Sequence, residues 1–196
     1  MKLRNAEKRL LIAVSQIIEN EGFSKIGVNK IAKQAKCDKV LIYRYFSGLE
    51  GLLAAWAKDN DFYTLAYQAY SESSEDIIKL TQTVLLKQLN FLRTNKLMQE
   101  LLAWELSGNS TFRSIQNERE RNGFKLQEEL EKKLGKESKD VRMFITILIA
   151  SINYIVLTTR QYRIFNGIDF SNPEAWELCK QTIYKYIRAL FENILK

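Results

Sequence analysis

The residues best suited to chemistry lie between Lys39 and Tyr45, in the segment KVLIYRY. Lysine and arginine pair with phosphates, and an arginine can donate two parallel hydrogen bonds to O6 and N7 of guanine. A tyrosine offers a hydroxyl to phosphate and a ring edge to a thymine methyl group. This mixture of basic and aromatic side chains indicates binding to nucleic acid.

The flanking sequence can hold this segment as an exposed helix. Ile31 and Ala32 give a first short helix an apolar face, and residues 36–38 form a turn. The carboxylate of Asp38 can accept from the unpaired amides of a second helix over residues 39–46. A helix, a short turn and a helix let the second helix enter a major groove while the first braces the backbone.

The predicted DNA contacts come from both helices. Base edges and phosphates are expected to meet the second helix, and the backbone or a neighbouring base the start of the first. For single residues another reading stays open, in which Tyr43 packs inward and Arg44 is only solvated. The predicted contacts are Asn29, Lys30, Lys39, Val40, Leu41, Tyr43, Arg44 and Tyr45.

From Ala35 to Phe46 the sequence AKCDKVLIYRYF resembles, without gaps, the turn and recognition helix of TetR/AcrR-type regulators. The pair Ile31-Ala32 upstream, and Glu50 and Leu52 downstream, fit the same pattern. The resemblance is strong over about the first quarter of the chain and general in layout over the rest. It implies an all-α fold, a homodimer, and a body that binds a small molecule.

Lys36, Leu41 and Leu49 are among the residues that depart from the family pattern. Lys36 replaces the usual turn glycine, which costs energy if the backbone there has a positive φ. Leu41 and Leu49 stand where many relatives have a hydroxylated residue and a lysine, so two plausible phosphate contacts are lost. They leave an alternative open, a helical protein-interaction module of the same fold with weakened or lost DNA binding.

Positive charge is concentrated in the N-terminal segment that contains these two short helices. The chain has 196 residues and a net charge of +7. Residues 1–49 hold ten Lys and Arg against four Asp and Glu, whereas residues 50–196 hold twenty against nineteen. A basic stretch by itself is most simply a solvated surface. A basic stretch that also contains a helix-turn-helix pattern favours a DNA-binding surface.

The composition argues against an enzyme. There is no histidine, which is the commonest general base and metal ligand, and no serine or cysteine has a base at a recognisable spacing. Cys37 and Cys179 are far apart and do not match metal or redox spacings, so reduced thiols are expected. The sequence therefore predicts no catalytic residues, no metal and no cofactor.

No membrane segment is predicted. Lys2, Arg4 and Glu7 interrupt any apolar run at the N-terminus, so no signal peptide is expected. The longest apolar stretch, Met143 to Leu157, is shorter than the ~20 residues that span a bilayer. A cytoplasmic protein is expected.

The periodicity of apolar residues predicts an all-α chain of about nine helices. Residues 1–50 form a three-helix helix-turn-helix domain, and residues 51–196 form a helical regulatory and dimerisation domain. A long helix is expected from Leu49 to Ser71, and the final helix is capped by Asn172 and opens at Pro173. Ser73 or Ser74 is expected to cap the helix after the long one, and Asn5 the first helix of the chain.

The last two helices are candidates for a dimer interface. The stretch over residues 141–157 is apolar nearly all round, so it must bury more than one side. These helices could complete a monomer core, or pair with the same helices of a second copy in a four-helix interface. We favour the dimer, with predicted interface residues Phe144, Leu148, Ile152, Ile155, Ile183, Ile187 and Leu190.

The family resemblance also implies a pocket for a small apolar or aromatic ligand whose binding releases a palindromic operator. Aromatic side chains of the body supply apolar area with a polar tip, although each is as readily an ordinary core residue. The predicted lining residues are Tyr63, Tyr67, Phe91, Trp104, Phe112 and Tyr154.

Overall fold

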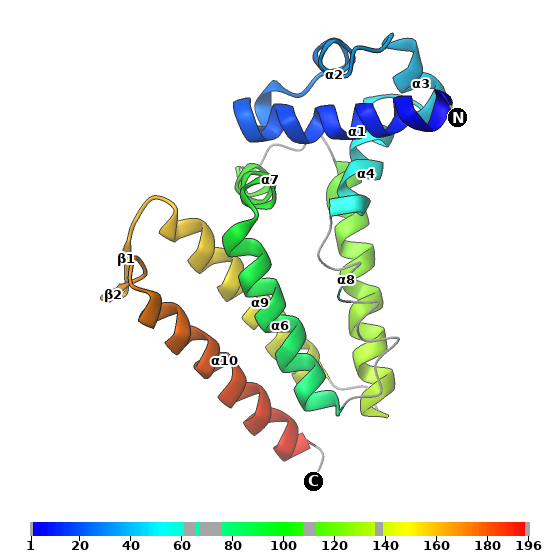
Figure 1. Ribbon diagram of the computed structural model, residues 1–196. Helices are drawn as coiled ribbons and strands as arrows, with labels where there is room; N and C mark the ends of the chain where they lie inside the picture. Colours follow the sequence, from blue (N-terminus) through cyan, green and yellow to red (C-terminus); the bar gives the residue numbers. More distant parts are fainter. Residues whose placement is uncertain (1, 61–65, 67–75, 108–112, 136–138, 195–196) are drawn as a thin grey trace. The chain divides into compact units, whose positions relative to one another are not determined.

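The computed structural model describes residues 2–60, 66, 76–107, 113–135 and 139–194. Apart from one short hairpin, the described elements are helices, which confirms the predicted all-α class (Figure 1). The elements are α1 (Lys2–Glu21), the 3-10 helix η1 (Phe23–Lys25), α2 (Val28–Gln34), α3 (Val40–Phe46), α4 (Leu49–Asn60), α6 (Ile77–Thr94), α7 (Lys96–Leu106), α8 (Arg113–Leu134), α9 (Lys139–Thr159), β1 (Ile164–Phe165), β2 (Ile168–Asp169) and α10 (Pro173–Ile194).

The chain divides into two compact units. One, the head unit, comprises Met1–Asp61 and Asn95–Asn122, and the other, the body unit, comprises Phe62–Thr94 and Gly123–Lys196. The head unit therefore includes α7 and the first part of α8 as well as the helices near the N-terminus. The boundary at residue 50, between a helix-turn-helix domain and a regulatory and dimerisation domain, stays a prediction.

An aromatic cluster lies at the centre of the head unit. The ring of Phe23, in η1, lies 4.4 Å from that of Trp104 on α7 and 6.3 Å from that of Trp56 on α4. Trp56 is fully buried, and its indole Nε1 donates to Ser15 Oγ on α1 at 2.9 Å. The cluster joins α1, α4 and α7 through one 3-10 turn, so these helices pack as a single core.

Helix α1 begins earlier than the sequence predicted. It starts at Lys2, so Asn5 lies inside the helix and does not cap it. Lysine, leucine and arginine are good helix formers, which lets the helix extend upstream of Asn5. The helix ends after Glu21, where Gly22 adopts a φ of 84° that glycine accommodates easily.

The turn between α2 and α3 closes α2 with a Schellman motif. The amide of Cys37 donates to Ala32 O at 3.0 Å, and the amide of Lys36 donates to Lys33 O at 3.2 Å. Lys36 occupies the left-handed position of this motif with a φ of 51°. The steric cost expected for a lysine in place of glycine is therefore present at this turn.

Helix α4 approaches α3 closely because Gly51 has no side chain. Ser47 and Gly48 both have positive φ, 60° and 119°, which turns the chain sharply enough for α4 to begin at Leu49. A Cβ atom placed on Gly51 would collide with the backbone carbonyl oxygen of Phe46 at the end of α3. The angle of α3 against the head core therefore depends on this glycine.

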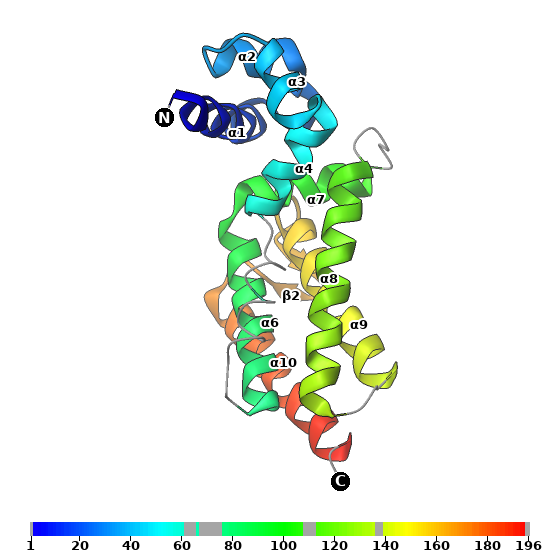
Figure 2. The same ribbon diagram turned by 90° about the vertical axis from the view of Figure 1, so that its right-hand side faces the viewer.

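The body unit is built around α6. Helix α6 packs against α9 and α10, and α9 also packs against α10 (Figures 1 and 2). Leu89 on α6 and Ile187 and Phe191 on α10 are fully buried. Gln82 Nε2 donates to the backbone oxygen of Tyr184 at 2.8 Å, so a buried polar side chain also ties α6 to α10.

A short hairpin of β1 and β2 lies between α9 and α10. Ile164 pairs with Asp169, and Phe165 pairs with Ile168, in antiparallel register. Asn166 and Gly167 form the connection with φ angles of 48° and 77°. Asn-Gly favours a two-residue hairpin turn, so the signal for this hairpin was present in the sequence and was missed.

The predicted start of the final helix at Pro173 is confirmed, and side-chain caps mark the starts of α6, α7 and α10. Asn95 Oδ1 accepts from the amide of Met98 at 3.0 Å at the start of α7, and Asn172 Oδ1 accepts from that of Glu174 at 2.9 Å beside Pro173. At the start of α6 the cap is Asp76, whose Oδ1 accepts from the amides of Ile78 and Lys79.

Two expectations lie outside the described residues. The long helix predicted from Leu49 is described as α4 to Asn60, and of its remainder only Ala66 is described. Ser73 and Ser74, the predicted caps of the following helix, also fall outside the described residues.

Helix α9 is longer than its predicted apolar stretch. It runs for 21 residues, and by length and composition alone it could cross a membrane, contrary to the expectation from Met143–Leu157. The difference arises because the helix extends past both ends of the apolar run, from Lys139 to Thr159. Only Val141, Ile145, Ile152 and Val156 of this helix are buried in the single chain, so much of its apolar surface is accessible.

We expect Gly51→Ala to lower the free energy of unfolding by about 1–3 kcal/mol, because overpacking against the Phe46 carbonyl outweighs the better helix propensity of alanine. Urea unfolding measures the change. Gly123→Ala is the control, since no atom outside its own helix lies within 4 Å of the added Cβ. It should raise stability by about 0.5–1 kcal/mol. A Gly51→Ala protein as stable as the parent would contradict the close approach.

Lys36→Gly is expected to raise the free energy of unfolding by about 1 kcal/mol, because glycine removes the strain of a side chain at positive φ. The same change at Lys33, inside α2, should instead lower it by about 1 kcal/mol. Both variants lose one positive charge, so their comparison isolates the backbone effect. Equal shifts in the two variants would show that Lys36 is unstrained.

Candidate nucleic-acid interface

Helix α3 has one buried side and one exposed side. Ile42 is fully buried in the head core and Phe46 is half-buried. On the other side Val40 and Tyr43 are 59% and 57% exposed, and Lys39, just before the helix, is exposed as well. Apolar and aromatic side chains this open are accessible to a partner, and here they stand beside a lysine.

The first turn of α3 is fixed by Asp38. Its Oδ1 accepts from the amide of Val40 at 2.9 Å, as expected for a cap, and the regular helix begins at Val40, one residue later than predicted. A helix that contacts base edges does so with residues near its N-terminus. The cap therefore fixes the position of the residues predicted to contact DNA.

Arg44 is held by its neighbour. Its Nη2 donates to the Tyr45 hydroxyl at 2.7 Å, and the guanidinium carbon lies 4.9 Å from the centroid of the Tyr45 ring. Tyr45 is half-buried, with its ring 6.4 Å from that of Phe46 in an edge-on arrangement. A guanidinium has five N–H donors, so Arg44 can keep this contact and still donate to a phosphate.

Helix α2 places one exposed and one paired residue at its start. Asn29 is exposed, and Lys30 forms an ion pair with Glu21 at the end of α1. The two side chains are 36% and 46% exposed, and a pair this open contributes no more than about 1 kcal/mol. Lys30 can therefore exchange Glu21 for a phosphate at little cost.

Leu41 and Leu49 are both half-buried. Part of each side chain is thus buried within the head, and neither side chain can donate to a phosphate. Lys36, noted in the sequence only as a departure from the family, is exposed in the turn before α3. Its charge adjoins the predicted contact residues, and its place in the turn was the signal that could have marked it.

Of the aromatic residues predicted to line a ligand pocket, the structure describes Phe91, Trp104 and Tyr154. Phe91 belongs to the body unit, whereas Trp104 packs on Phe23 in the head unit. Tyr154 is 56% exposed and lies edge-on to Phe165. Tyr63, Tyr67 and Phe112 lie outside the described residues, and the role of all six stays a prediction.

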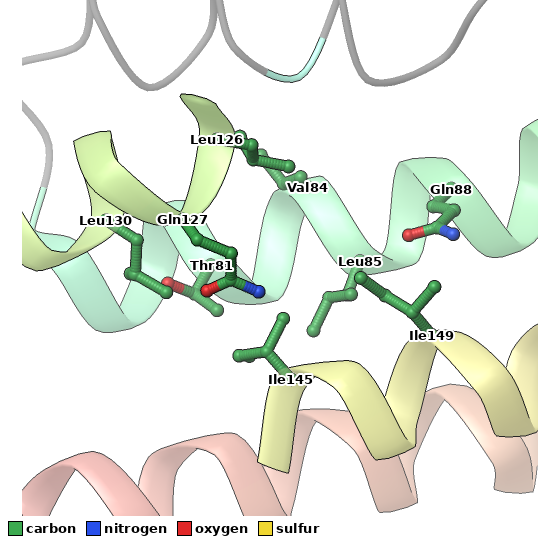
Figure 3. Close-up of a pocket in the computed structure, with 9 residues that line it drawn as sticks. All are labelled: Thr81, Val84, Leu85, Gln88, Leu126, Gln127, Leu130, Ile145 and Ile149. Carbon is green, nitrogen blue, oxygen red and sulfur yellow. The ribbon is translucent and has the colours of Figure 1, made fainter. Parts of the chain in front are cut away.

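A cavity of the body unit is lined by other residues, from α6, the later part of α8, and α9 (Figure 3). Its lining is mainly branched aliphatic, whereas the predicted lining residues are all aromatic. The lining residues are Thr81, Val84, Leu85, Gln88, Leu126, Gln127, Leu130, Ile145 and Ile149.

The predicted dimer residues differ in how much surface they offer. Ile152, Ile183 and Ile187 are already buried within the chain, so they have almost no surface left for a partner. Phe144, Leu148, Ile155 and Leu190 are half-buried. The large exposed apolar side chains on the two helices are instead Met143, Ile147, Tyr154, Leu178, Tyr184 and Tyr186.

The two cysteines are free and half-buried. Burial raises the pKa of the Cys179 thiol, and the Arg93 guanidinium opposes this rise without cancelling it. Cys37 Sγ lies 3.3 Å from the backbone oxygen of Ala35 within the turn. Among the described residues, no three His, Cys, Asp or Glu side chains gather as a metal site would require.

Residues 11–56 match the sequence pattern of the family described as "Bacterial regulatory proteins, tetR family". The matched segment runs from α1 through α2 and α3 into α4 and so covers the whole helix-turn-helix. No curated protein sequence matches the chain.

Solved structures share the fold over nearly the whole chain. A TetR-family transcriptional regulator from Streptomyces coelicolor is 17% identical, with 94% of this chain and 98% of that chain covered and a TM-score of 0.62. A TetR-family regulator from Marinobacter aquaeolei VT8 is 20% identical, with 94% and 97% covered and a TM-score of 0.64. The fatty acid degradation regulator FadR from Bacillus halodurans is 17% identical, with 93% and 94% covered and a TM-score of 0.62.

The comparisons join a sequence match in the N-terminal helices to a structural match over nearly the whole chain. The sequence match lies on the segment whose α3 exposes Lys39, Val40 and Tyr43, and the structural match extends over the body helices. Residues 11–56 are therefore similar to the tetR family of bacterial regulatory proteins, and the chain as a whole has the fold of TetR-family transcriptional regulators.

Proposed function

We propose that the protein is a dimeric transcriptional repressor of the cytoplasm, released from a palindromic operator by a small molecule bound in the body unit. The observation that carries the proposal is the exposed basic and aromatic side of α3, within a segment that matches a family of DNA-binding regulators.

In this proposal α3 enters a major groove. Lys39 and Arg44 donate to phosphates or guanine edges, and Val40 and Tyr43 bring apolar surface to thymine methyl groups. Asn29 and Lys30, at the start of α2, hold the backbone and fix the register. Leu41 and Leu49 make fewer phosphate contacts than a lysine and a hydroxyl would, so specific affinity depends more on the contacts of α3 with the bases.

A dimer would bury the exposed apolar side chains of α9 and α10. Met143 and Ile147 lie four residues apart on α9 and are 60% and 54% exposed, and Leu178 on α10 is 56% exposed. Exposed apolar side chains at helical spacing on adjacent helices fit an isologous four-helix interface. The two α3 helices of such a dimer would read half-sites related by a two-fold axis.

Release by a ligand requires different affinities for the two conformations of the regulator. Helix α8 contributes residues to both compact units, up to Asn122 in the head unit and from Gly123 in the body unit. A ligand that displaces the later part of α8 can therefore change the head through a continuous helix. In this proposal α8 transmits the effect of the ligand.

Lys39→Ala combined with Tyr43→Ala is expected to abolish specific DNA binding, because it removes a charge and an aromatic contact from the exposed side of α3. Fluorescence anisotropy compares a duplex from the region upstream of the protein's own gene with a random duplex of equal length. The parent should prefer the first by about a thousandfold or more, and the variant should bind both alike.

The control for this experiment is Phe124→Ala with Lys125→Ala, which removes an exposed aromatic and a lysine from α8. It should bind like the parent. If the parent itself bound the upstream duplex no better than random DNA, the repressor proposal would fail and the interaction-module alternative would stand.

Ile147→Arg is expected to convert the dimer to a monomer, because it places a charge in the proposed apolar interface on α9. Sedimentation equilibrium measures the mass. Ile12→Arg is the matched control, since Ile12 on α1 is 55% exposed against 54% for Ile147, and it should leave the dimer intact. An unchanged mass for Ile147→Arg, or a monomeric parent, would refute the interface.

A further inference from the structure

The cavity of the body unit carries polar groups in an apolar wall. Val84, Leu85, Leu126, Leu130, Ile145 and Ile149 supply the apolar part of the lining. About 10 Å³ of the cavity is open to the centre of a water molecule, which is room for about one water. A larger molecule must therefore move apart the helices that line it.

Gln127 is the polar group that most needs a partner. Its Oε1 is buried and accepts no hydrogen bond from the described residues. In Figure 3 the amide of Gln127 reaches from α8 toward Thr81 on α6, with Ile145 on α9 nearby. Burying an amide oxygen without a partner costs about 1–3 kcal/mol, so a molecule that donates to it would recover this cost.

The two other polar side chains of the lining are almost fully buried. Thr81 is 1% exposed, and its Oγ1 donates to the backbone oxygen of Ile77 at 2.8 Å. Gln88 is 6% exposed, one turn along α6 from Val84. Polar side chains thus line the cavity from both α6 and α8, as is typical of a pocket that orients a ligand.

Among the residues that the structure describes, the nine that line the cavity carry no charge. A carboxylate or an ammonium group placed there would lose its hydration without gaining an ionic partner, which costs several kcal/mol. A neutral hydroxyl or N–H group pays no such cost. The lining therefore selects against ionised ligands.

We propose that this cavity binds a neutral, mainly apolar molecule that carries a hydroxyl or N–H group, which donates to Oε1 of Gln127. This inference rests on the proposed release by a small molecule and names the chemical class of that molecule. The apolar part of the ligand lies against the leucine and isoleucine side chains. Its polar group donates to Gln127 Oε1, a buried acceptor that has no donor among the described residues.

Heptan-1-ol, heptanoate and heptylammonium test the class, because they share an alkyl chain and differ in charge. Isothermal titration calorimetry on the full-length protein at pH 7 should give saturable binding of heptan-1-ol. The dissociation constants of heptanoate and heptylammonium should be at least about tenfold higher. Tighter binding of either ion than of the alcohol would overturn the assignment.

Gln127→Leu tests the polar contact, because leucine keeps the side chain's bulk and removes the acceptor. Its affinity for heptan-1-ol should fall by about tenfold. Gln116→Leu, the same substitution at an exposed position of α8, is the control and should bind as the parent does. If Gln127→Leu bound the alcohol as tightly as the parent, or if the parent bound none, Gln127 would face only solvent water and the inference would fail.

DNA binding is measured on the same proteins by anisotropy. Specific binding to the upstream duplex without any binding of the alcohol would overturn the ligand class alone. Loss of specific DNA binding in the parent would overturn the proposed function, and calorimetry would still report whether the cavity takes the alcohol.

Discussion

The fold of the head depends on one close approach of backbone, between Gly51 on α4 and the carbonyl of Phe46 at the end of α3. Helix α3 has only seven residues, too few to be stable in isolation. Its stability must come from tertiary contacts, through Ile42 and the turn at Ser47 and Gly48. Because α4 lies so near, one side of α3 is fixed against the core and the opposite side is exposed.

Several features of the head reduce stability in places where they serve the proposed function. Lys36 adopts a left-handed conformation that glycine would adopt more easily, and it adds a positive charge beside α3. Val40 and Tyr43 expose apolar surface without burying it in the single chain. Conflicts between local preference and global fold concentrate at functional sites, and these three residues fit that rule.

Local signals in the sequence were enough to predict much of this structure. The helix-turn-helix, the buried Ile42, the hydrogen bond from Asp38 and the end of α1 at Gly22 each follow from residues close together in the chain. Features that depend on distant contacts could not be predicted in this way. The role of Gly51 becomes visible only when Phe46 lies beside it, and which sides of α9 and α10 are buried depends on how both pack on α6. The cavity was missed because apolar aliphatic side chains carry no chemical signature along the sequence.

Hydroxyl-radical footprinting of the protein on the duplex upstream of its own gene tests whether a symmetric dimer recognises DNA through its two α3 helices. It reports both where the protein binds and how many copies bind. A symmetric dimer should give two protected patches related by a two-fold axis, with centres about 34–36 Å apart or slightly more. A single patch, or protection that spreads evenly along the duplex, would contradict recognition by a symmetric dimer.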